Sequence, residues 1–220
     1  FGRSLWLAVL TTLLTLLIGY PFAYFTAGLP PKKRSLALML VIVPFWTNSL
    51  VRIYGWMILL RGQGVVNSLL AALGLIDAPL KLLYNFGAVL VGMVYALIPF
   101  MILSVYNAVA KLDPALIEAA RDLGAGRWRA FWTITVPMTR AGIMAGCVLV
   151  FIPSIGLFFI SDLLGGSKTM LLGNLIRDEL LTARNWPLGA ALSVVMMAAT
   201  LLVIGGYRRL SGEKSLEGIV

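Results

Sequence analysis

Long apolar runs separated by short charged segments dominate the pattern of this chain. Five stretches carry almost no charged side chain: residues 5–27, 35–60, 82–110, 141–161 and 185–207. A helix needs about 20 apolar residues to cross a bilayer, and a spanning segment must satisfy its own backbone hydrogen bonds. The pattern therefore predicts an all-α membrane protein with five transmembrane helices. Buried helices of a soluble protein are the alternative, but such helices average only about 12 residues.

The composition agrees with a membrane protein. Hydrophobic residues make up 60% of the 220 residues and charged residues 12%, against about 45–50% and about 25% in soluble domains. The net charge of +9 is also typical of nucleic-acid-binding proteins, but a chain this apolar offers no polar face for nucleic acid. Histidine is absent and Cys147 is the one cysteine, so we expect no metal, no cofactor and no histidine-based catalysis.

The basic residues fall unevenly on the two sides of the predicted membrane. One side has six, Arg52 lies within a span, and the other side has eleven: Lys32, Lys33, Arg34, Lys111, Arg121, Arg127, Arg129, Arg140, Arg208, Arg209 and Lys214. Lys and Arg are enriched in cytoplasmic loops, so the pattern predicts a cytoplasmic C-terminus. Five spans that end inside place residue 1 outside, and we expect one further span upstream in the native protein.

Two shorter apolar stretches lie on the predicted outer side. Residues 65–73 and 170–176 carry apolar side chains at helical spacing. Both are too short to cross a membrane. They are interpreted as interfacial helices on the outer surface, with loop packing as an equal alternative.

The cytoplasmic connection over residues 111–140 has the clearest local signals. Asp113 suits a helix N-cap, Pro114 suits the first helical position, and Gly124 suits a left-handed C-terminal residue. A second helical stretch is expected over 127–135, ending before Pro137. In the span that follows, Gly142 and Gly146 form a G-x-x-x-G pattern, which predicts close helix packing.

The same connection carries a spaced motif: Glu118-Ala119-Ala120, Gly124, Ile134 and then Val136-Pro137. This resembles the EAA loop of the permeases of ABC importers, in the binding-protein-dependent, MetI-like type I family. The resemblance implies that this helix docks in a cleft of the ATP-hydrolysing subunit, so that the permease itself is not an enzyme. It assigns ATPase coupling to six residues: Glu118, Ala119, Ala120, Gly124, Ile134 and Pro137. An ordinary amphipathic connector is the alternative interpretation.

Further segments, over residues 19–23, 43–55 and 161–166, resemble the PotB-type permeases of spermidine/putrescine importers. The resemblance implies one MetI-like transmembrane domain over residues 1–220 in the bacterial inner membrane. It also implies three partners besides the lipid bilayer: a second permease of the PotC type, an ATPase dimer of the PotA type, and a periplasmic polyamine-binding protein of the PotD type. Import of another small solute by the same family is the alternative function.

A path for polyamines requires carboxylates or aromatic faces, because the cargo carries several ammonium groups. The candidate path residues are Trp46, Asn48, Arg52, Tyr54, Trp56 and Asp162. Spacings of three and four put Phe45, Asn48, Arg52 and Trp56 on one face of the expected second helix. Arg52 would repel the cargo, so pairing with Asp162 or with a partner subunit is the alternative role, and the aromatic residues are equally suited to helix packing.

Two other function classes fit the sequence less well. An ion-coupled secondary transporter normally keeps acidic or histidine residues within its spans, and here only Asp162 lies near one. A membrane scaffold has no reason to carry the coupling motif.

Overall fold

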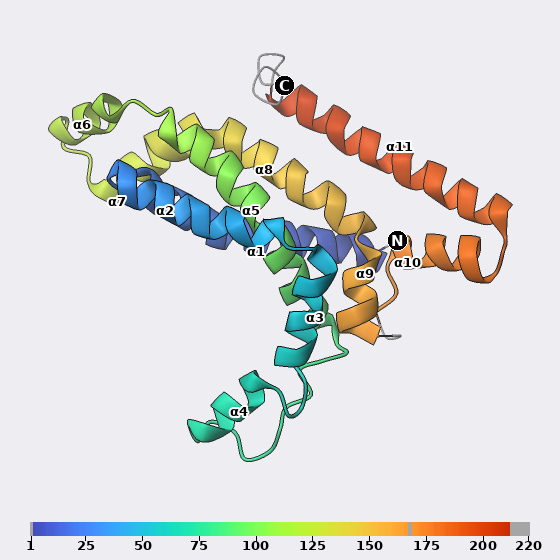
Figure 1. Cartoon of the computed structure of the whole chain (residues 1–220). Coiled ribbons are helices and arrows are strands. Elements are labelled where there is room, and N and C mark those ends of the chain that lie inside the picture. The colour runs from blue at the N-terminus through green and yellow to red at the C-terminus, as the bar shows by residue number, and fades with distance from the viewer. Residues whose placement is uncertain (1, 167–168, 212–220) are drawn as a thin grey trace.

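The computed structural model describes residues 2–166 and 169–211, and all of the secondary structure in these residues is helical (Figure 1). Four helices in this part of the chain are long and apolar enough to cross a membrane, and a bent helix pair makes a fifth candidate. The predicted all-α membrane fold is confirmed.

Three long helices form the centre of the molecule: α1 (Gly2–Ala27), α5 (Phe86–Ala110) and α8 (Val136–Gly156). Their shared core includes the buried side chains of Leu97, Met101, Val105 and Val150. The Tyr20 hydroxyl on α1 and the Thr139 hydroxyl on α8 hydrogen-bond at 3.0 Å in this core. A buried polar pair of this kind fixes the register of two membrane helices.

Small residues bring α5 and α8 into direct backbone contact, as the G-x-x-x-G pattern predicted. A Cβ added at Gly142 would lie 2.4 Å from the Cβ of Ala108 and 2.8 Å from the Ser104 carbonyl oxygen. At Gly146 it would lie 2.7 Å from the Met101 sulfur. The Ser104 hydroxyl donates to the Gly142 carbonyl at 2.9 Å.

The second predicted span is not one helix, which corrects the expectation over residues 35–60. It consists of α2 (Pro31–Ile42), the 3₁₀ turn η1 (Val43–Trp46) and α3 (Ser49–Leu59), and the two arms meet at 97°. The Thr47 N–H and hydroxyl both bond to the Pro44 carbonyl, and Thr47 is extended. The Asn48 side chain then accepts the Leu50 N–H at 2.8 Å and caps α3. Both ends of the break therefore have their own local hydrogen bonds.

The fourth span begins earlier than predicted. The short helix α7 (Arg127–Ala130) continues through the π-helical turn η2 (Phe131–Thr135) into α8, giving a 30-residue candidate span. The Val136 N–H bonds to the Phe131 carbonyl, and a wider turn of this kind accommodates Pro137, which has no N–H to donate. The expected stop before Pro137 is therefore wrong.

The side that the sequence predicts to face outward contains shorter elements. They are α4 (Val65–Ala72), α9 (Phe158–Ile160), the π-helical turn η3 (Ser161–Gly165), α10 (Leu172–Arg177) and the π-helical turn η5 (Asp178–Thr182). A second core joins α3, α5 and η3 through Ile53, Met93 and Leu164. Both predicted short helices exist, at α4 and α10, while their position at a membrane surface remains a prediction.

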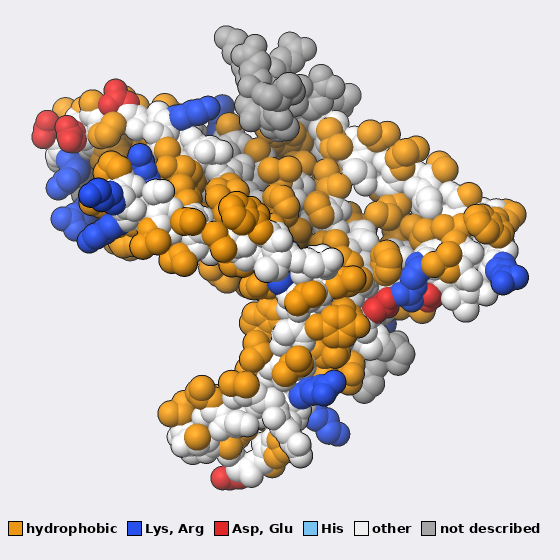
Figure 2. Space-filling model, in the orientation of Figure 1, with side chains coloured by type: hydrophobic (Ala, Val, Ile, Leu, Met, Phe, Trp, Pro, Cys, Tyr) orange, Lys and Arg blue, Asp and Glu red, His pale blue; other side chains and the backbone are white. Residues whose placement is uncertain are grey.

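The last helix, α11 (Trp186–Ser211), leans away from the central bundle (Figure 1). It contacts α8, α10 and η5, while Val194, Met197 and Leu202 are exposed. Apolar side chains cover the flanks of the molecule, and charged ones gather at the end that carries α6 (Pro114–Asp122) (Figure 2).

Candidate functional site

The predicted coupling motif begins on a helix whose two ends are fixed by local bonds. The Asp113 carboxylate accepts the Ala115 N–H at 3.0 Å, and Pro114 occupies the first turn of α6. At the other end Gly124 has φ +84°, and the Gly124 N–H donates to the Arg121 carbonyl at 2.9 Å. The Ala125 N–H donates to the Ala120 carbonyl at 3.0 Å. Both predicted caps are confirmed.

The helix α6 stands at the end of the bundle (Figure 1). None of its residues is buried. Glu118 and Ala119 are exposed, Ala120 is half-buried, and Leu123 is 89% exposed. A short helix with a small-residue face beside an exposed leucine is suited to a groove on another protein.

Ile134 and Pro137 lie on the candidate span that follows α6. Ile134 is half-buried in η2, and Pro137 is exposed in the first turn of α8. The helix α6 packs mainly against α7 and η2, which continue into α8. The helix α6 therefore contacts the start of one continuous helical rod, formed by α7, η2 and α8.

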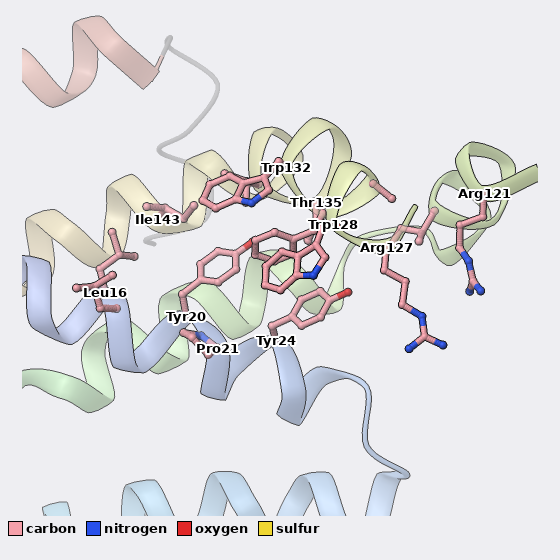
Figure 3. Close-up of a pocket in the computed structure, with 15 residues that line it drawn as sticks. Leu16, Tyr20, Pro21, Tyr24, Arg121, Arg127, Trp128, Trp132, Thr135 and Ile143 are labelled. Atoms are coloured by element: carbon pink, nitrogen blue, oxygen red, sulfur yellow. The ribbon is translucent and has the colours of Figure 1, made fainter. Parts of the chain in front are cut away.

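A hollow of about 870 Å³, which sequence reasoning missed, lies beside this rod (Figure 3). Its aromatic residues are Tyr20 and Tyr24 from α1, Trp128 from α7, and Phe131 and Trp132 from η2. Phe131 is at the centre of the group: its ring lies 5.7 Å from Tyr20, 5.6 Å from Tyr24 and 5.3 Å from Trp132. The aromatic spacing in 128–132 was visible in the sequence, but the tyrosines of α1 come from more than 100 positions earlier.

The candidate path residues of the second span do not form one helical face, because the break at Thr47 and Asn48 separates them. Trp46 is 81% exposed on η1, and Tyr54 is 48% exposed on α3. Asn48 is the α3 cap. Trp56 is half-buried, with its ring 5.5 Å from that of Tyr95 on α5.

Arg52 lies against aromatic rings. Its guanidinium carbon is 4.2 Å from the centre of the Phe45 ring and 5.8 Å from that of Tyr95. Its Nε and Nη1 atoms are buried and have no hydrogen-bond partner among the described residues. Pairing of Arg52 with Asp162, one of the expected alternatives, is therefore not found.

Asp162, on η3, bonds to two residues of the helix α10. Its carboxylate forms an ion pair with Arg177 and accepts a hydrogen bond from the Asn174 side chain. Arg177 also pairs with Asp178 at 2.7 Å and lies 5.3 Å from the Phe158 ring centre. This network joins η3 to α10. Although η3 itself packs against α3, no ion pair among the described residues joins Asp162 to the second span.

Comparison with known proteins gives a consistent result. Residues 5–213 match the family described as "Binding-protein-dependent transport system inner membrane component". The chain is 49% identical over 215 residues to the spermidine/putrescine transport system permease protein PotB of Escherichia coli (strain K12), covering 96% of this chain and 78% of that protein. It is 28% identical to the molybdenum transport system permease protein ModB of Azotobacter vinelandii, covering 74% and 71% of the two chains.

A solved structure has a similar fold. It is that of a bacterial alginate ABC transporter in complex with an alginate-pentasaccharide-bound periplasmic protein, with a TM-score of 0.76 and 20% identity, over 98% of this chain and 80% of that one. At this identity the likeness concerns the fold alone.

Proposed function

Because the chain belongs to the family of binding-protein-dependent transport system inner membrane components, we propose that it carries spermidine and putrescine inward as a permease subunit of an ABC importer. One observation supports this cargo above all: the 49% identity to PotB over 96% of the chain. A permease of this family is a multi-pass inner-membrane protein that does not itself hydrolyse ATP, and it works with ATPase and binding-protein partners.

The coupling step is assigned to α6. In this proposal Glu118, Ala119 and Ala120 enter a cleft of an ATPase subunit, and Gly124 ends the inserted helix. Closure of the ATPase dimer moves α6, and α7 with η2 passes the movement to α8. The exposed surface of α6 and the unbroken helix from Arg127 to Gly156 support this route.

The partners proposed are a second permease of the PotC type, two PotA-type ATPase subunits and a PotD-type polyamine-binding protein. The binding protein is expected on the outer segments around α4 and α10. The end of α1, the end of α5 and the start of the rod share one end of the bundle, through the contacts of Ala27, Val109 and Phe131. The excess of Lys and Arg there supports a cytoplasmic position, with the C-terminus on the same side.

The cargo is tested by ATP hydrolysis in the complete complex. The importer is reconstituted in nanodiscs with its binding protein, and hydrolysis is measured with spermidine, with putrescine, with molybdate and with no solute. Stimulation by a polyamine and not by molybdate is the expected result. Stimulation by molybdate alone, or by none of the three, contradicts the polyamine assignment and leaves the family unchanged.

Asp162 provides a test of the cargo path. Because Asp162 and Arg177 neutralise each other, with side chains 34% and 31% exposed, we expect Asp162→Asn and Arg177→Gln to weaken uptake slightly and in the same direction. An ion pair this exposed contributes only about 0–1 kcal/mol. If Asp162 instead bound the cargo, Arg177→Gln would free the carboxylate and strengthen uptake while Asp162→Asn weakened it. Uptake rates of the two variants at limiting spermidine distinguish these outcomes.

A further inference from the structure

The break in the second span contains a site that is already occupied by a cation of the chain itself. Three elements meet there: η1 contributes Phe45, α3 contributes Arg52, and α5 contributes Tyr95. The Arg52 guanidinium lies 4.2 Å and 5.8 Å from the centres of the two rings. Both distances are within the range of about 6 Å in which a ring face attracts a cation.

The two rings are held in place by other aromatic residues. Phe45 packs edge-to-face on Phe100 with ring centres 5.7 Å apart, and Tyr95 packs in the same way on Trp56 at 5.5 Å. Edge-to-face pairs are favourable and restrict ring rotation. Phe45 and Tyr95 therefore each have an aromatic contact that does not involve Arg52.

Arg52 is itself poorly satisfied in this site. A guanidinium has five N–H donors, and the buried Nε and Nη1 of Arg52 meet no acceptor among the described residues. Asp162, the carboxylate that the sequence analysis offered as a partner for Arg52, forms its ion pair with Arg177. Buried donors without partners cost free energy, which offsets part of the attraction between the Arg52 guanidinium and the two rings within this chain.

We propose that the rings of Phe45 and Tyr95 form a binding site for an ammonium group of the passing polyamine, which Arg52 fills when no cargo is present. This inference rests on the proposed function. An ammonium group has the charge that the ring faces attract, and its compact shape leaves room for water or cargo atoms at its remaining donors. The cargo and the Arg52 side chain then compete for the same two ring faces.

The competition has a conformational consequence. Phe45 and Arg52 lie on opposite sides of the break at Thr47 and Asn48, so their contact holds the 97° bend between the two arms of the span. An ammonium group that displaces Arg52 removes this contact and releases α3 from η1. Arrival of cargo is thereby linked to the shape of the second span.

The test measures equilibrium binding of radiolabelled spermidine to the whole importer in nanodiscs, without its binding protein. Arg52→Gln is expected to tighten spermidine binding about fivefold, because the competing guanidinium is removed. Phe45→Leu and Tyr95→Leu are each expected to weaken it about fivefold, because a ring face is lost. The double variant with Arg52→Gln and Phe45→Leu should lose the tighter spermidine binding expected of Arg52→Gln alone. Phe25→Leu, at an aromatic residue that is 67% exposed on α1, serves as the control and leaves binding unchanged.

Only assembled complexes, isolated by size-exclusion chromatography, enter the comparison. Weaker or unchanged binding in Arg52→Gln overturns the proposal, as does the absence of measurable binding in that variant. If the wild-type importer with its binding protein takes up no polyamine, the proposed function fails instead. Normal uptake without the binding pattern rejects this inference alone.

Discussion

Gly124→Val is expected to reduce solute uptake at least tenfold while the subunit still inserts and assembles in the membrane. Gly124 has φ +84°, and a side chain in the left-handed region costs roughly 1–2 kcal/mol per residue, with a β-branched one at the upper end. Valine therefore favours loss of the closing bonds from Gly124 to Arg121 and from Ala125 to Ala120. The last turn of α6 then opens, and the helix no longer presents a rigid face to the ATPase.

Gly126 offers a matched control two residues away. A Cβ at either position meets no atom within 4 Å, but Gly126 has φ −64°, which any residue adopts. Gly126→Val should therefore retain most of the uptake. The measurements are spermidine uptake by cells and the amount of complex purified from their membranes. Equal uptake by the two variants would contradict the assignment of α6 as the coupling helix.

A charge reversal probes the same surface without changing the backbone. Glu118 is exposed and makes no ion pair among the described residues, so Glu118→Lys changes little within this subunit. Loss of uptake with normal assembly in this variant would place the effect at the contact with the ATPase.

Much of the architecture follows from patterns that are local in the chain. The spans now seen as α1, α5 and α11 are long charge-free runs, and the caps of α6 depend on residues next to the helix. The close contact of α5 with α8 was visible as G-x-x-x-G, because glycine spacing alone decides which face of a helix can approach a neighbour.

The break in the second span illustrates what local patterns leave undecided. Residues 35–60 are apolar enough for a straight helix, and a proline is tolerated in many membrane helices, as Pro21 and Pro99 are here. Pro44 differs because Thr47 and Asn48 provide alternative hydrogen bonds on both sides of the break.

The candidate path depended on contacts between distant segments. Arg177 lies 15 positions beyond Asp162, and Tyr95 lies 43 positions beyond Arg52. Periodicity within one helix carries no information about either pair, so the sequence analysis identified neither Arg177 as the partner of Asp162 nor Tyr95 as a ring beside Arg52.

Gly142→Val is expected to destabilise the whole bundle. In an ordinary helix, replacing glycine with a larger residue is favourable, because glycine costs about 1 kcal/mol relative to alanine. At Gly142 the added Cβ alone would lie 2.4 Å from the Cβ of Ala108 and 2.8 Å from the Ser104 carbonyl oxygen, and a backbone atom cannot rotate away. Separating α5 from α8 also breaks the bond from the Ser104 hydroxyl to the Gly142 carbonyl. Overpacking of this kind costs about 1–3 kcal/mol or more, which exceeds the gain in helix propensity.

The control is Gly205→Val on α11, where a Cβ meets nothing within 4 Å. The apparent melting temperature of each purified complex in detergent and the amount of subunit in the membrane are the measurements. Gly142→Val should lower both, and Gly205→Val neither. A Gly142 variant that melts normally would contradict the close packing of α5 on α8. Coupling through α8 would then lose its support, because the rod that begins at α7 would have no tightly packed neighbour to move against.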